Sequence, residues 1–204
     1  MLTYMLVLLL LVNPYIFGVS NFKHQSVFIL LVFISTVIIP AFSVFLMKKL
    51  GFIETLEMKT KQERILPYII TGLFYMWLFV NLLNNTEIPI AYTIFVLGAT
   101  IGLFLAFLIN LFSKISMHTV GMGGLVGMVI ITMLQFSYGV FAVDLPLVGF
   151  VEISMNSLLM MVILLAGIVG TSRMILRAHE PNELYGGFLV GLSTQFIAAF
   201  FLFF

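Results

Sequence analysis

The chain has 204 residues, of which 62% are hydrophobic and only 8% carry a charge. Soluble domains carry about 25% charged residues, and a chain of this length cannot bury so much apolar surface in a soluble fold. The composition therefore excludes a disordered chain, a nucleic-acid-binding protein and a disulfide-stapled secreted domain, and the lack of cysteine also excludes thiolate metal sites. The net charge of +1 points to no partner. The sequence predicts an integral membrane protein.

Seven apolar segments are candidate membrane spans, because about 20 apolar residues cross the hydrocarbon core of a bilayer. Their apolar runs are continuous rather than alternating, which favours helices over a β-barrel. In chain order they cover 2–20, 26–47, 68–84, 89–112, 119–143, 153–171 and 184–204. We therefore expect an all-α, polytopic transmembrane helical bundle of about six or seven spans, forming one domain over residues 1–204.

The first of these segments, 2–20, contains Asn13 and Pro14. It lacks the basic leader and the small-residue cleavage site of a signal peptide, so we expect it to remain as structure. Polar gaps separate the spans, the longest being 48–67, and Asp144 with Glu152 marks the gap before the sixth span.

Small and aromatic residues in the spans indicate how the helices pack. Glycine pairs four residues apart let membrane helices approach closely, and three such pairs occur: Gly98 and Gly102, Gly123 and Gly127, and Gly187 and Gly191. Tyrosines near span ends are typical of an aromatic belt at the membrane surface, and five fit this description: Tyr4, Tyr68, Tyr92, Tyr138 and Tyr185.

The ionisable residues are divided unevenly between the two membrane faces. The gaps after the second, fourth and sixth spans lie on one face and hold 15 of the 20 Lys, Arg, Asp, Glu and His residues. Eight of the nine Lys and Arg residues are among them, and the positive-inside rule places such a face in the cytoplasm. Orientation alone does not require two histidines among these cations. A polar active site assembled from three loops is therefore the competing interpretation.

The gap after the sixth span contains a His and an acid in a pattern that suits catalysis. Ser172-Arg173 is followed after five residues by His179, and Glu183 lies four residues further on. A carboxylate at this spacing on a helix can face the imidazole. It would fix the tautomer and leave the other ring nitrogen free and more basic, as a nucleophile or base requires. Pro181 indicates a turn that enters the last helix, with Glu183 in its first turn.

The other two gaps on this face contain residues that could bind an anion. Ser116 and His118 precede a glycine-rich helix start, where a hydroxyl and backbone N–H groups can bind an anion. Lys59, Lys61 and Arg64 lie in the earlier gap, and Arg suits bidentate contacts with phosphate oxygens. Together, the side chains in the three gaps are suited to binding a phosphate ester at the membrane surface.

These residues resemble the type 2 phosphatidic acid phosphatase family, which are lipid phosphatases related to vanadium haloperoxidases. The family's third motif, Ser-Arg-x5-His-x3-Asp, is matched by Ser172, Arg173, His179 and Glu183, with Glu in place of Asp. The likeness runs over roughly residues 55–190 and keeps the order of the family's motifs.

The other two motifs depart further from the family's pattern. Pro-Ser-Gly-His keeps Ser116 and His118, while Ile115 and Met117 replace Pro and Gly. Lys-x6-Arg-Pro keeps Arg64, but Pro67 follows three residues later, and Lys61 or Lys59 stands in for the lysine. The resemblance implies a divergent bacterial member with a phosphatase core at 55–190, preceded by two leading helices within 1–50.

The resemblance implies a metal-independent hydrolase that needs no cofactor and forms a phosphohistidine. His179 would attack phosphorus, Glu183 would orient it, and His118 would protonate the departing oxygen. The phosphate oxygens would be held by Lys61, Arg64, Ser116 and Arg173. The substrate would be a phospholipid or a polyprenyl phosphate or diphosphate, and phosphoryl transfer to another lipid would use the same site.

Other interpretations remain open. Two histidines on membrane helices can ligate haem, although here they lie at loop edges among cations, and no acidic cluster favours a metal ion. The chain could instead be a non-enzymatic membrane protein, such as a transporter or an inactive relative that binds anionic lipid. The Lys and Arg count places the site in the cytoplasm, whereas the family works on the outer, periplasmic face of the bacterial inner membrane, which we favour.

Overall fold

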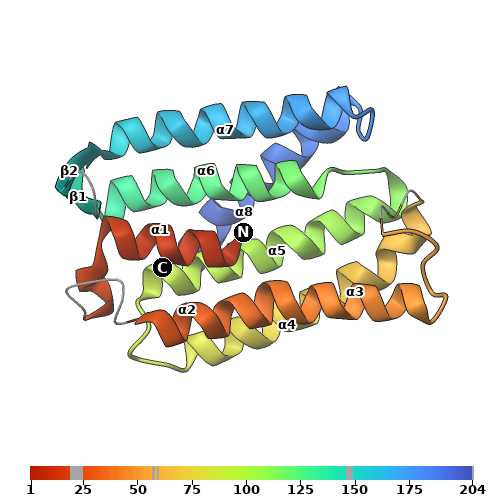
Figure 1. The fold of residues 1–204 in the computed structure, drawn as a ribbon, viewed down its shortest axis with the longest axis horizontal. Helices are drawn as coiled ribbons and strands as arrows, with labels where there is room; N and C mark the ends of the chain where they lie inside the picture. Colours follow the sequence, from red (N-terminus) through yellow and green to blue (C-terminus); the bar gives the residue numbers. More distant parts are fainter. Residues whose placement is uncertain (19–24, 57, 59, 146–148, 204) are drawn as a thin grey trace.

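The computed structural model describes residues 1–18, 25–56, 58, 60–145 and 149–203. Long helices run side by side along the longest axis of the molecule (Figure 1). In the described ranges, six helical segments are long and apolar enough to cross a membrane. The prediction of an all-α polytopic bundle is therefore confirmed.

The first of the six segments is continuous but built of three parts: α2 (Ser26–Phe33), a π-helical turn η3 (Ile34–Ile38) and α3 (Ile39–Lys49). The other five are single helices. They are α4 (Lys61–Leu83), α5 (Ile90–Phe112), α6 (Met117–Gln135), α7 (Met155–Ile175) and α8 (Pro181–Phe203).

The prediction of a span over 2–20 is wrong. Its helix, α1 (Leu2–Val12), has 11 residues and is followed at Pro14 by a 3-10 turn, η1 (Pro14–Phe17). At about 1.5 Å per residue this helix covers roughly half of a 30 Å hydrocarbon core. Leu2, Leu6 and Leu9 are fully buried, so α1 fills the inside of the bundle in the half nearer the β-hairpin (Figure 1).

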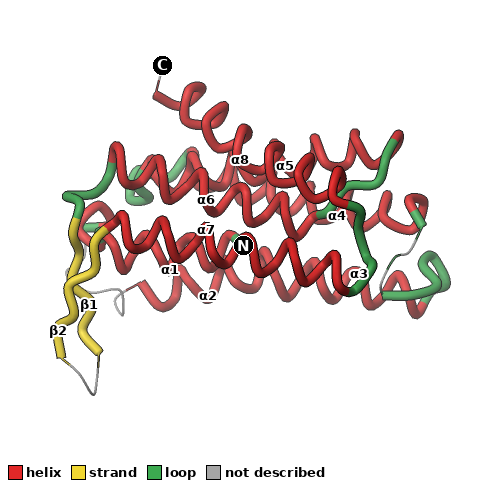
Figure 2. The backbone as a smooth tube through the Cα atoms, turned by 90° about the horizontal axis from the view of Figure 1, so that it is seen from above, coloured by secondary structure: helices red, strands yellow, loops and turns green. Residues whose placement is uncertain are grey.

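The fifth predicted span, 119–143, is too long at its end. Helix α6 ends at Gln135, and Gly139 adopts a left-handed backbone with φ of 86°. An antiparallel hairpin of β1 (Val140–Leu145) and β2 (Gly149–Ser154) follows, with Val140 opposite Ser154. The hairpin projects from one end of the helices (Figure 2). The apolar sequence continues from α6 into β1, so hydropathy alone does not mark the end of the helix.

The polar gap predicted over 48–67 is also too long, because α4 already begins at Lys61. Thr60 accepts a hydrogen bond from the backbone N–H of Glu63, and the Glu63 carboxylate accepts one from the backbone N–H of Thr60. This capping box satisfies two free donors at the helix start. It places Arg64 and Pro67 inside a helix rather than in a loop.

The close-packing prediction for the glycines is confirmed between α6 and α8. Helix α8 packs most extensively on α6 and then on α5. A Cβ at Gly191 would collide with the Val120 carbonyl oxygen, and one at Gly123 with that of Phe188. The two backbones therefore touch at these positions, as small residues allow in membrane helices.

The three polar segments that the sequence assigns to one face do lie together. The α3–α4, α5–α6 and α7–α8 connections are all at the end of the bundle opposite the hairpin (Figures 1 and 2). This end carries the candidate site.

Candidate functional site

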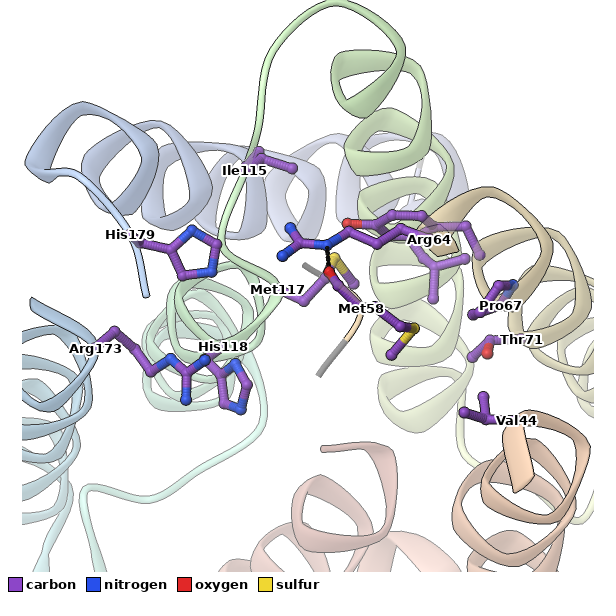
Figure 3. Close-up of a pocket in the computed structure, with 12 residues that line it drawn as sticks. Val44, Met58, Arg64, Pro67, Thr71, Ile115, Met117, His118, Arg173 and His179 are labelled. Atoms are coloured by element: carbon purple, nitrogen blue, oxygen red, sulfur yellow. Dashed lines mark hydrogen bonds between the residues drawn. The ribbon is translucent and has the colours of Figure 1, made fainter. Parts of the chain in front are cut away.

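A cavity of about 260 Å³ opens among these three connections. Its polar and charged lining consists of Arg64, Tyr68, Thr71, His118, Arg173 and His179. The two histidines and Arg173 lie on the side opposite Pro67 of α4 and Val44 of α3 (Figure 3). Other apolar side chains, such as Leu103 of α5, also line it, so the cavity is amphipathic.

The start of α8 holds His179 against Glu183. The chain reverses after α7 through Arg177, whose φ of 50° is left-handed, and α8 then begins at Pro181. The imidazole Nδ1 of His179 lies 2.7 Å from Glu183 Oε2, and the Glu180 backbone N–H donates to the same oxygen at 3.3 Å. With Nδ1 donating its proton to the carboxylate, Nε2 is left with a free lone pair. The predicted pairing of His179 with Glu183 is confirmed.

Burial keeps His179 in its neutral form. Its side chain is 5% exposed. Desolvation lowers the pKa of His179 below the ordinary 6.5 because the charged imidazolium loses water. The hydrogen bond and charge of Glu183 raise this pKa, while the charges of Lys114 and Arg64 lower it. The net lowering leaves an unprotonated ring nitrogen near neutral pH, as nucleophilic attack requires.

His118 and Arg173 lie next to one another on the same side of the cavity as His179 (Figure 3). His118 is exposed in the first turn of α6, and Arg173 is half-buried in the last turn of α7. The Arg173 Nε is buried and has no hydrogen-bond partner in the part of the chain that the structure describes. A guanidinium in this state can still bind an anion.

Arg64 enters the cavity from α4 and faces the two histidines. Its Nε donates to the Met58 carbonyl oxygen at 2.8 Å, which fixes the plane of the guanidinium. Figure 3 shows the terminal nitrogens directed toward His179. Arg64 and Arg173 thus approach the same space from different helices, and a phosphate between them would meet two guanidinium groups.

Two of the predicted phosphate-binding residues do not line the cavity. Lys61 lies one turn before Arg64 on α4. Its Nζ donates to the Phe112 carbonyl oxygen, at the end of α5, at 2.6 Å. Ser116 is fully buried, and its Oγ has no hydrogen-bond partner among the described residues. Its backbone N–H donates to the Glu183 carbonyl oxygen at 3.4 Å. Lys59 lies outside the described residues.

The sequence interpretation missed two residues at the site. Lys114 donates from Nζ to the Ala178 carbonyl oxygen at 2.8 Å and so holds the loop that carries His179. Tyr68 lines the cavity beside Arg64 and is 6% exposed, so its assignment to an aromatic belt is wrong. The four-residue spacing of Arg64 and Tyr68 would have revealed a shared helix face, had the helix been extended back to Lys61.

No family model, curated protein or solved structure matches this chain. A functional assignment therefore rests on the geometry of the site. That geometry is a neutral, carboxylate-bound histidine, a second histidine and two guanidinium groups around one amphipathic cavity. In the described ranges, no three His, Asp or Glu side chains gather as a metal site.

Proposed function

We propose that this membrane protein is a lipid phosphate or diphosphate phosphatase that acts through a phosphohistidine intermediate. The observation that carries the proposal is the 2.7 Å contact between His179 Nδ1 and Glu183 beside a cavity lined by Arg64, Arg173 and His118. The order of the three motif-like segments, which resembles the type 2 phosphatidic acid phosphatase family, gives it further support.

In the first half of the reaction, His179 Nε2 attacks phosphorus and forms an N–P bond. The P–O bond to the lipid breaks, and the departing oxygen takes a proton from His118. Glu183 stabilises the positive charge on the phosphorylated imidazole. Arg64 and Arg173 bind the non-bridging oxygens, whose charge rises in the transition state.

In the second half, water attacks phosphorus and the N–P bond breaks. His118, now neutral, accepts the proton from the water, so that inorganic phosphate leaves and both histidines return to their starting states. Transfer to the hydroxyl of a second lipid would follow the same steps with that hydroxyl in place of water.

The amphipathic cavity at one end of a membrane bundle favours a lipid substrate over a soluble one. A charged headgroup suits the guanidinium side, and the chain suits the wall formed by Val44, Pro67 and Leu103. We further propose that the protein lies in a bacterial inner membrane with this end in the periplasm. Labelling of a cysteine placed at the exposed Lys49 by a membrane-impermeant thiol reagent in intact cells would support that orientation.

The decisive experiment is phosphate release from hexadecyl phosphate by the purified protein in detergent with EDTA present. We expect turnover in wild type and a loss of about three orders of magnitude or more in His179→Ala. Equal release by wild type and His179→Ala would overturn the phosphohistidine mechanism. Binding of the phosphate ester without any release by wild type would favour the alternative, a non-enzymatic protein that binds anionic lipid.

A further inference from the structure

A second cavity, of about 210 Å³, lies inside the bundle next to the first. Three residues line both cavities: Thr71 of α4, Leu103 of α5 and Met117 of α6. The two cavities are therefore adjacent, and these three shared residues, here called the neck, lie where the cavities meet. Met117, which replaces the glycine of the family's second motif, thus lies on the wall between the two cavities.

The inner cavity lies where α1 meets α4, α5, α6 and α8. Met5 of α1 and Gln195 of α8 contribute to its lining, together with several glycines of α5, α6 and α8. Because Met1 and Met5 line it and it shares three residues with the first cavity, the inner cavity lies between the start of α1 and the catalytic end. A chain attached to a phosphate at that end would extend along the helices to reach it.

We propose that the inner cavity holds the far part of the substrate's hydrocarbon chain, which enters through the neck of Thr71, Leu103 and Met117. This inference rests on the proposed function, since it takes the phosphate to bind at His179. The lining is mostly methionine, leucine, valine, alanine and glycine. An apolar cavity of about 150 Å³ already binds benzene or xenon, so the inner cavity can hold a segment of alkyl chain.

Gln195 is a buried polar side chain at this cavity that lacks a partner for one of its atoms. It is 1% exposed, and its Oε1 has no hydrogen-bond partner within the described ranges. Its amide packs against Gly98 and Gly124, and its Cβ and Cγ pack against Gly127. We take it as the floor that limits how far the chain can enter. A ligand with a hydrogen-bond donor is the competing occupant.

Gly124→Ala tests the proposal by narrowing the cavity without a clash. The new methyl group would lie 3.4 Å from Gln195 Nε2 and 3.6 Å from Met5 Cε, which is ordinary van der Waals contact. The measurement is the ratio of kcat/KM for hexadecyl phosphate to kcat/KM for butyl phosphate. We expect this ratio to fall about tenfold, since one methylene in an apolar pocket is worth at least that much.

The matched control is Gly167→Ala on the exposed side of α7, where a Cβ would have no described atom within 4 Å. The ratio should stay at its wild-type value there. An unchanged ratio in Gly124→Ala would overturn the inference while leaving the phosphatase intact. If wild type hydrolyses neither ester, the proposed function itself fails.

Gln195→Met separates a hydrocarbon chain from a hydrogen-bonding ligand. A chain offers no donor to Oε1, so the ratio for the two esters should be kept or raised when a thioether of similar size replaces the amide. A tenfold fall would mean that an apolar side chain at position 195 disfavours the long chain, which would overturn the hydrocarbon assignment.

A readout that needs no turnover is photolabelling with hexadecyl phosphate carrying a diazirine at the end of its chain. The inference predicts labels on Met5 or Gln195, located by mass spectrometry and reduced by unlabelled hexadecyl phosphate. Labels confined to lipid-facing residues such as Leu164, which is 65% exposed, would overturn it.

Discussion

The Glu183 carboxylate and the His179 imidazole are joined at 2.7 Å across the start of α8, and the backbone N–H of Glu180 donates to the same carboxylate oxygen. Glu183 is therefore held by its own helix while it holds the histidine. The contact shows that a glutamate at this position reaches the imidazole directly.

Substitutions of Glu183 should show whether its charge or its size is needed for catalysis. Glu183→Gln keeps the size but removes the charge that stabilises the imidazolium, and we expect kcat to fall by about two orders of magnitude or more, as for other acids that orient a histidine. Glu183→Asp should retain partial activity. The assay is phosphate release in detergent, with the exposed Glu180→Gln as a control. Full activity of Glu183→Gln would mean that the carboxylate does not act on His179.

The pH dependence of kcat/KM should report the lowered pKa of His179. Burial lowers this pKa below 6.5, so His179 stays neutral to lower pH than a solvated histidine, and the acidic limb of the profile should lie below pH 6.5.

Two variants should move that limb in opposite directions. Glu183→Gln removes contributions that raise the pKa of His179, so the limb should move to lower pH. Lys114→Met removes a positive charge that lowers it, so the limb should move to higher pH. Shifts in the same direction would show that another group controls the limb.

Arg64→Lys should weaken phosphate binding although the charge is kept. The Arg64 guanidinium uses Nε for the Met58 carbonyl oxygen and still directs two nitrogens into the cavity, which a lysine ammonium cannot reproduce. A hydrogen bond to a charged group contributes about 1.5–3 kcal/mol, so kcat/KM should fall roughly tenfold to hundredfold.

Lys61→Met provides the matched comparison for Arg64→Lys. Lys61 is exposed and binds the end of α5, so its loss should change kcat/KM by no more than about threefold. If Lys61→Met proves as damaging as Arg64→Lys, then Lys61 contacts the substrate and its assignment from the family's first motif is right after all.

Gly191→Ala should destabilise the bundle where α8 touches α6. The new Cβ would collide with the Val120 carbonyl oxygen, and the backbone cannot move aside without separating the helices. Overpacking of this kind costs about 1–3 kcal/mol, so the thermal midpoint in detergent should fall by roughly 5 °C. Gly186→Ala, on the same helix but with no described atom near its Cβ, should leave the midpoint unchanged. Equal midpoints for the two variants would contradict the close packing.

The sequence predicts the long helices well because their apolar runs are continuous, and it predicts which polar segments share a face because each helix reverses the chain. It fails where an apolar run changes structure without changing hydropathy. Residues 119–143 read as one span but contain the end of α6 and the first residues of β1. Residues 2–20 read as a span although Pro14 ends a helix of 11 residues.

Within the site, the sequence predicts best those residues whose geometry is local. His179 and Glu183 are four residues apart, and the turn that leads into α8 brings them together. Lys61 and Ser116 were assigned by motif position, but their surroundings depend on tertiary packing: Lys61 on the end of α5, and Ser116 on the close approach of α6 and α8. The capping box of Thr60 and Glu63 marks the start of α4, and the sequence interpretation did not recognise it. The helix face that Arg64 shares with Tyr68 was therefore not predicted either.

The contacts of α8 have a consequence for how the protein is made. Helix α8 leaves the ribosome after α5, α6 and α7, yet it packs extensively on both α6 and α5. Until α8 inserts, Gly123 of α6 lacks its backbone contact with Phe188, and His179 lacks its contact with Glu183. Completion of the bundle and completion of the site are thus a single event in biogenesis. A chain arrested before α8 would lack the helix that packs most extensively on α6, and its His179 would have no Glu183 to hold the imidazole.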